Sequence, residues 1–177
     1  LEGPQYDKEG QPLLLNDGSH LDYTPHITSL FDSSNPARAN EGVRSAKYEY
    51  ADGLQGECMN NDYVVYRYAD VLMMKGEALV RQGHADLAVP LFNEVRKRTG
   101  LPDYEAADLT IDEIYDERGR EFAWEGLRRQ DMIRFGKWCE PRDLKPAVSP
   151  EYTKLYPIPA DIRKTNANLK QNDGYPD

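Results

Sequence analysis

The clearest pattern of hydrophobic and polar positions lies between residues 62 and 99. In DYVVYRYADVLMMKGEALVRQG, apolar residues recur every three or four positions, which is the spacing of one face of an α-helix. Gly83 is expected to end this helix, because glycine readily takes the left-handed conformation that follows a helix C-terminus. The next segment, HADLAVPLFNEVRKRTG, has the same spacing and stops before Pro102. The pattern therefore predicts a helical hairpin.

The hairpin also fits the 34-residue register of a tetratricopeptide repeat. With Ala69 as the first position, Gly83 falls at the turn, whereas Lys75 departs from the register because an apolar residue is usual there. A single repeat cannot bury both of its faces, so this one is expected to pack on flanking segments or to lack partner repeats. The residues at the packing positions are Leu72, Gly76, Leu79, Ala88, Phe92 and Val95.

Two more helices are predicted after the hairpin. Thr110 stands three residues before Glu113, which is the spacing of a helix-capping box. This spacing predicts a helix over residues 111–125. Gly126 then permits a bend, and a second short helix is expected over residues 128–135.

Both ends of the chain have the composition of loops. The first 60 residues are rich in Gly, Pro, Asn, Asp and Ser, which favour turns, and only short strands are expected there, at 12–15 and 45–50. Near the other end, Pro157 and Pro159 disfavour helix in the residues before them, so one helical turn in PADIRKTN is all that is expected. The predicted division is a loop-rich segment 1–60, a helical part 61–140 and an extended segment 141–177.

Charge and composition narrow the classes of partner. The net charge is −9, and an acidic chain is repelled by nucleic acids and by anionic membranes. No run of 18 apolar residues occurs, so no membrane-spanning helix is predicted. Cys58 and Cys139 lie far apart and outside any C-x-x-C motif, which favours free thiols. The chain begins at Leu1 without a leader, as expected of a mature or excised piece.

The helix predicted at 111–125 carries a row of carboxylates that could suggest catalysis. Paired carboxylates hydrolyse glycosides when they lie roughly 5 to 9.5 Å apart. Arginines surround this row, however, and would lower the carboxylate pKa values and so remove the proton donor. Ion pairs are the preferred interpretation, and a glycosidase is the less favoured alternative. The row consists of Glu113, Glu117, Glu121 and Glu125.

Other candidate chemistry is weaker. His20, Asp22 and His26 lie close together in sequence, but their spacing is not a recognised ligand pattern, so no metal site is predicted. There is no Gly-x-Ser-x-Gly nucleophile motif and no glycine-rich phosphate loop. The sequence therefore predicts neither an enzyme nor a cofactor.

Tyrosines in the polar loops suggest carbohydrate binding. The flat C–H faces of sugars stack on aromatic rings, and polar side chains nearby hold the hydroxyl groups. The alternative is that each tyrosine fastens a loop to the helices. The candidate residues are Tyr6, Tyr23, Tyr48 and Tyr50.

Four segments, in order and over most of residues 43–175, point to a family. They are GVRSAKYEY, YRYADVLMMKGEALVRQG, DERGREFAWEGLRRQDMIRFGKW and LYPIPADIRKTNANLKQNDGY. Together they resemble the C-terminal part of the SusD/RagB family. The resemblance implies an all-α fold with a tetratricopeptide-like helical hairpin, long irregular loops and a few short strands.

The resemblance also implies a function. Members of this family are non-enzymatic lipoproteins on the outer membrane surface of Bacteroidetes, where they capture oligosaccharides, polysaccharides or sometimes peptides and cover a SusC-like TonB-dependent transporter. This chain would be one fragment of a larger SusD-like domain, without the lipid anchor and most repeats. A tetratricopeptide-type protein-interaction module is the alternative. The charged helix would be an internal ion-pair network formed by Glu117, Arg118, Glu125, Arg128, Asp131 and Arg134.

Overall fold

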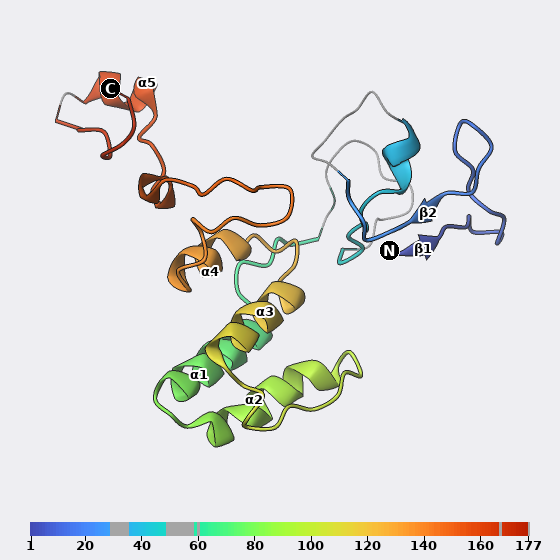
Figure 1. Ribbon diagram of the computed structural model, residues 1–177, viewed down its shortest axis with the longest axis horizontal. Coiled ribbons are helices and arrows are strands. Elements are labelled where there is room, and N and C mark those ends of the chain that lie inside the picture. Colours follow the sequence, from blue (N-terminus) through green and yellow to red (C-terminus); the bar gives the residue numbers. More distant parts are fainter. Residues whose placement is uncertain (29–35, 49–58, 60, 167, 177) are drawn as a thin grey trace. The chain divides into compact units, whose positions relative to one another are not determined.

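The computed structural model describes residues 1–28, 36–48, 59, 61–166 and 168–176 (Figure 1). The chain forms two compact units, each described below by itself. One unit comprises Leu1–Asn60 and Pro141–Val148, and the other comprises Asn61–Glu140 and Ser149–Asp177. Helices dominate, and the described residues contain one two-stranded sheet, so the predicted all-α class is confirmed.

The predicted hairpin consists of α1 (Tyr68–Arg81) and α2 (Ala85–Lys97), which run side by side in opposite directions (Figure 1). Gly83, at φ 85°, makes the turn between them in the left-handed conformation that glycine tolerates. Residues 62–67 do not join α1, so this helix begins later than its apolar pattern does.

Close packing between α1 and α2 depends on Gly76. A Cβ atom at this position would overlap the ring of Phe92, so the absence of a side chain lets the two helices approach. Phe92 is completely buried, and Leu72 and Val95 are also buried, as the repeat register predicts. Leu79 is only partly buried, against the edge of the same core.

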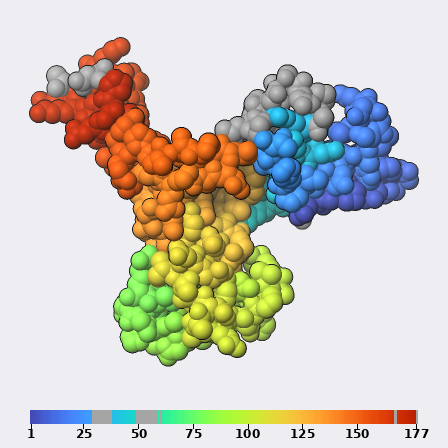
Figure 2. Space-filling view, viewed as in Figure 1, coloured from blue at the N-terminus to red at the C-terminus, as the bar shows by residue number. Residues whose placement is uncertain are grey.

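The core continues from the hairpin into the segment that follows it. Asn93 holds this segment against α2, because its amide group accepts from the Tyr104 N–H at 2.8 Å and donates to the Tyr104 carbonyl at 3.0 Å. Figure 2 shows α1, α2 and this segment, in green to yellow, as one continuous lobe. The buried hydrophobic cluster consists of Leu72, Met73, Ala88, Phe92, Val95, Tyr104, Leu109, Ile114 and Phe122.

Two shorter helices follow, α3 (Ile111–Glu121) and α4 (Arg128–Arg134). The Thr110 hydroxyl accepts from the Glu113 N–H at 3.1 Å and so caps α3. The predicted helix to residue 125 is too long, because residues 122–126 form turns that include Trp124 at φ 67°. None of the helices in the part of the chain described above is long and apolar enough to cross a bilayer.

The end of this unit is mostly extended, with a 3₁₀ turn η2 (Glu151–Lys154) and a short helix α5 (Ala160–Thr165). The helix is the predicted turn in PADIRKTN, whereas η2 has no counterpart in the prediction. Gln171 fastens the proline-rich stretch, because its side chain accepts from the Ile158 N–H at 2.8 Å and donates to the Ile158 carbonyl at 3.1 Å.

The other unit holds an antiparallel sheet of β1 (Gly3–Pro4) and β2 (Asp22–Tyr23), and a 3₁₀ helix η1 (Pro36–Asn40). The strand expected at 12–15 is reduced to isolated bridges from Pro12 to Tyr6 and from Leu14 to His20. Residues 45–48 form no strand, and the rest of the strand expected at 45–50 lies outside the described residues.

Candidate functional site

Each carboxylate of the row Glu113, Glu117, Glu121 and Glu125 is paired with an arginine. Glu113 contacts Arg120, and Glu117 lies 2.6 Å from Arg120 and 3.1 Å from Arg96. Three of the carboxylates in the row, Glu117, Glu121 and Glu125, are buried.

Arg67 pairs with the last two carboxylates of this row, Glu121 and Glu125. Arg67, immediately before α1, forms a two-pronged contact with Glu125 at 2.7 and 3.0 Å and approaches Glu121 at 2.6 Å. Arg98, at the end of α2, lies 2.8 Å from Glu121 as well. Bidentate geometry of this kind makes strong, directional pairs. Arg67 therefore ties the start of α1 to the turn after α3.

The most deeply buried charge is Arg118, on α3. Its guanidinium lies 2.9 Å from Asp70 on α1 and donates to Asp131 on α4 at 2.9 Å. All three side chains are at most 3% exposed. A buried charge is tolerated only when it is paired, so Arg118 and its two carboxylates depend on one another. This cluster joins three helices that are far apart in sequence.

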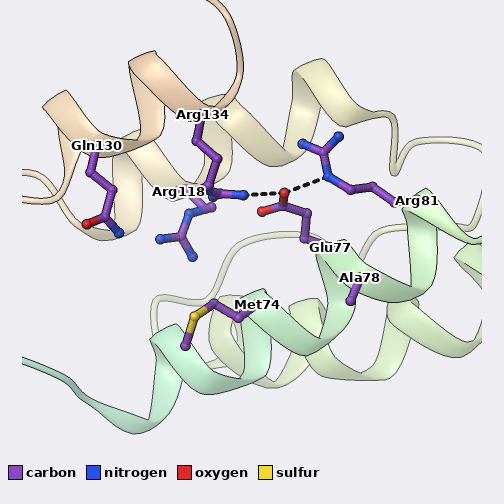
Figure 3. Close-up of a pocket in the computed structure, with 7 residues that line it drawn as sticks. All are labelled: Met74, Glu77, Ala78, Arg81, Arg118, Gln130 and Arg134. Carbon is purple, nitrogen blue, oxygen red and sulfur yellow. Dashed lines mark hydrogen bonds and ion pairs between the residues drawn. The ribbon is translucent and has the colours of Figure 1, made fainter. Parts of the chain in front are cut away.

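A hollow of about 410 Å3 opens beside this cluster (Figure 3). On one wall Glu77 of α1 receives bonds from Arg81 at 2.7 Å and from Arg134 of α4, which also donates to Asp131 at 2.8 Å. The remaining Glu77 oxygen is buried and has no hydrogen-bond partner among residues 61–166 and the other described positions. Gln130 lies on the wall formed by α4.

Two pKa shifts follow from this arrangement. Burial raises the pKa of Tyr104 well above its ordinary value, and the hydrogen bond to Glu113 adds to the effect. For Glu113 itself, burial favours a higher pKa, but the hydrogen bonds from Tyr104 and Arg120 outweigh it and lower the pKa. A glycosidase needs one carboxyl group that stays protonated near neutral pH. Glu113 is shifted in the opposite direction.

The structure brings five of the six residues expected in the network into ion pairs, and it adds partners beyond those six. Arg128 differs, because in the described part of the chain its guanidinium lies over the Tyr115 ring at 3.7 Å and donates to the Tyr115 carbonyl at 2.8 Å. The added partners are Arg67, Asp70, Glu77, Arg81, Arg96, Arg98, Glu113, Arg120 and Glu121.

A sequence signal for two of these partners does exist. Asp70 and Glu77 stand at helical spacing with Met73, on the face of α1 that is buried. A charged residue within an apolar stripe needs a partner, because its burial is otherwise too costly.

Among the described residues, no ring contact joins the candidate tyrosines Tyr6, Tyr23 and Tyr48 to one another. Tyr6 is exposed and its ring meets His20 edge-on, with centroids 5.1 Å apart. Tyr23 is partly buried beneath the Arg44 guanidinium, which lies 4.5 Å from its ring centre. Tyr48 is partly buried, and Tyr50 lies outside the described residues.

The structure also bears on the possible metal ligands and on the two cysteines. Among the described residues, no group of three or more His, Cys, Asp or Glu side chains could hold a metal ion. The segment with His20, Asp22 and His26 is included in this result. The Cys139 thiol lies 3.9 Å from the Pro150 carbonyl oxygen, and Cys58 lies outside the described residues.

A second hollow, of about 510 Å3, lies at the turn after α3 and was not anticipated from the sequence. It opens beside Trp124, whose side chain is 69% exposed. Its lining residues are Asp116, Gly119, Arg120, Ala123, Trp124 and Arg128.

Comparison with known proteins gives consistent matches. The model of the SusD family matches residues 27–145. The starch-binding protein SusD of Bacteroides thetaiotaomicron is 34% identical over 125 residues, which is 66% of this chain and 22% of that protein. The SusD-like protein P2 of Formosa agariphila is 31% identical over 148 residues, covering 72% of this chain and 29% of that protein.

Solved structures agree. Surface glycan-binding protein A from Bacteroides thetaiotaomicron, in complex with laminarihexaose, is similar with a TM-score of 0.54 and 32% identity. The similarity covers 64% of this chain and 25% of that chain. The chain thus spans between a fifth and a third of the length of the curated relatives it matches. These relatives are named as binding or SusD-like proteins, and none is named as an enzyme.

Proposed function

The chain belongs to the SusD family, and from this premise we propose that it is the C-terminal helical part of a non-catalytic protein that captures glycans for import. Two of its relatives support glycan binding, since one is a starch-binding protein and another was solved with laminarihexaose. Their activities are carried over to this chain as a proposal, because it spans only part of their length.

The observation that carries the proposal is the pairing of every carboxylate in the row on α3 with an arginine. Glu117, for example, is buried and bound by both Arg96 and Arg120. Carboxylates paired in this way hold helices together, and the pKa of Glu113, in the same row, is lowered by the hydrogen bonds from Tyr104 and Arg120 despite burial. The charged helix therefore acts as a scaffold, and ligand binding is assigned to loops and exposed aromatic residues, including Tyr6, Tyr23, Tyr48 and Tyr50.

The proposal includes a partner and a location. The complete protein is proposed to be lipid-anchored on the outer membrane and to work with a SusC-like transporter, with an oligosaccharide or polysaccharide as cargo. A second candidate, a tetratricopeptide-type protein-interaction module, is favoured by one observation. Tyr68, Val71 and Met74, spaced three residues apart on α1, are all exposed, and such a row is suited to contact with another protein.

Two measurements on the complete gene product separate these functions. Affinity electrophoresis through gels containing single polysaccharides tests glycan capture, and the expected result is retarded migration in at least one gel. A pull-down from outer membranes tests the transporter, which should be recovered as a β-barrel protein. Release of reducing sugar from the same polysaccharides would contradict the proposal and favour a glycosidase. If no gel retards migration and the pull-down recovers a protein other than a transporter, the interaction module would be favoured.

A further inference from the structure

The hollow at the turn after α3 is built around a strained aromatic residue. Trp124 has a φ of 67°, a left-handed conformation that is unfavourable for a residue with a side chain. Its neighbours hold it there, since Phe122 is buried in the core and the buried Glu125 is bound by Arg67. Such strain persists where the surrounding structure enforces it, and it is concentrated at functional sites. Here the result is an indole ring presented to solvent.

The basic side chains around this ring are fixed in place. Arg128 crosses α3 at Gly119, where an added Cβ would come within 2.6 Å of its Nη1 atom, and it stacks on Tyr115. Glu117 holds Arg120 in place, because the Arg120 Nε donates to the Glu117 carboxylate at 2.8 Å. Both guanidiniums line the hollow with little freedom to move.

One acidic group in the hollow has unused bonding capacity. The Asp116 side chain is exposed, and it forms no hydrogen bond or ion pair with any residue in the described part of the chain. An ionised carboxylate can accept several hydrogen bonds. Because Asp116 faces the same hollow as Arg120 and Arg128, the site offers both acceptors and donors beside one aromatic surface.

This combination selects a ligand class. An anionic ligand would lie against the Asp116 carboxylate, and a purely apolar ligand would cover that carboxylate without offering it a hydrogen bond. A neutral sugar satisfies both constraints, because it has an apolar C–H face and hydroxyl groups that both donate and accept. We propose that the hollow is a glycan subsite in which a pyranose ring stacks on Trp124 and its hydroxyls bond Asp116 and Arg128. This inference rests on the proposed function and assigns to it a site outside the tyrosine-bearing loops.

The two tryptophans of the chain allow a direct test. Trp138 serves as the control, because its indole N–H donates to the Thr153 hydroxyl at 2.9 Å and Arg129 lies over its ring. In a Trp138→Phe variant, fluorescence reports Trp124 alone. Titration with laminarihexaose should shift the emission to shorter wavelength and protect it from iodide quenching, in a saturable way. An open-chain hexitol, which has hydroxyls but no ring face, should do neither.

Binding itself is tested with Trp124→Gly in the otherwise unchanged chain. Glycine suits the left-handed conformation, so this variant should melt at the same or a higher temperature than the wild type. Its affinity for laminarihexaose, measured by calorimetry, should fall at least about tenfold, equivalent to about 1.4 kcal/mol. A loss of affinity without a loss of stability cannot be attributed to misfolding.

The outcomes separate the subsite from the proposed function. If the Trp124→Gly variant binds laminarihexaose as the wild type does, the subsite is wrong and glycan capture stands. If Trp124 fluorescence does not respond to laminarihexaose while the complete gene product is retarded by a polysaccharide, the subsite is again wrong. If no polysaccharide retards the complete gene product and Trp124 does not respond, both are overturned.

Discussion

Replacement of Arg118 by alanine should destabilise the helical unit severely. The side chain is 1% exposed, and its loss would leave Asp70 and Asp131 buried without the cation between them. Asp131 retains Arg134, but among the described residues the Asp70 carboxylate has no second cation. Breaking a buried pair in this way costs about 3–5 kcal/mol. Since whole domains are stable by only about 5–15 kcal/mol, the loss is a large part of the total.

The expected effect can be measured in two ways. For a chain of this size, 1 kcal/mol corresponds to about 2–4 °C, so the melting temperature of Arg118→Ala should fall by about 6–20 °C. Urea unfolding followed by circular dichroism should give the same loss with an unchanged m-value. The matched control is Arg118→Met combined with Asp70→Asn and Asp131→Asn, which removes all three charges and should recover part of the stability. A loss below about 1 kcal/mol for Arg118→Ala would show that the buried carboxylates find other partners, and the scaffold argument would fail.

Three further predictions concern packing and pH. Gly76→Ala should lower stability by about 1–3 kcal/mol, because the new methyl group would overlap the Phe92 ring; an unchanged melting curve would show that the ring moves aside. Spectrophotometric titration should find a tyrosine that ionises well above the ordinary range and is lost in Tyr104→Phe, since burial and the bond to Glu113 raise the Tyr104 pKa. As the pH rises, Tyr104 loses its proton in the unfolded chain before it does so in the folded chain. The free energy of unfolding should therefore fall as the pH rises above about 10. In the folded state the Glu113 pKa is lowered despite burial, because Tyr104 and Arg120 donate hydrogen bonds to the carboxylate. Ionised Glu113 therefore adds to the free energy of unfolding above about pH 4.3, and this stabilisation is lost as the pH falls further. Glu113→Gln should therefore flatten the acid side of the stability profile, and an unchanged profile would argue against the pairing.

The hairpin could be predicted from the sequence because its determinants are local. Apolar spacing and the glycine at position 83 are enough to define α1 and α2, and the tight contact at Gly76 follows from the repeat register. The partners of the charged helix could not be predicted in the same way. Arg67 is 58 residues from Glu125 in sequence, and nothing local to either residue specifies the other.

The end of α3 and the exposed tryptophan were missed for a different reason. A left-handed conformation at Trp124 contradicts the preference of the residue itself, and it is imposed by contacts on both sides of the turn. Sequence reasoning extended the helix to residue 125 because Gly126 was taken as the residue that permits a bend. The tyrosine-bearing loops include residues outside the described part of the chain, so their role as a ligand site stays a prediction.

The long separations between paired charges also have a consequence for the order of folding. Contacts within the α1–α2 hairpin are short in sequence and close small loops, so they can form early. Arg134 and Glu77 are 57 residues apart, and Arg118 must lose its hydration shell before it can reach Asp70 and Asp131. We therefore expect the hairpin to be structured in the transition state and the charged cluster to assemble after it. Substitutions in the cluster would then accelerate unfolding far more than they slow folding.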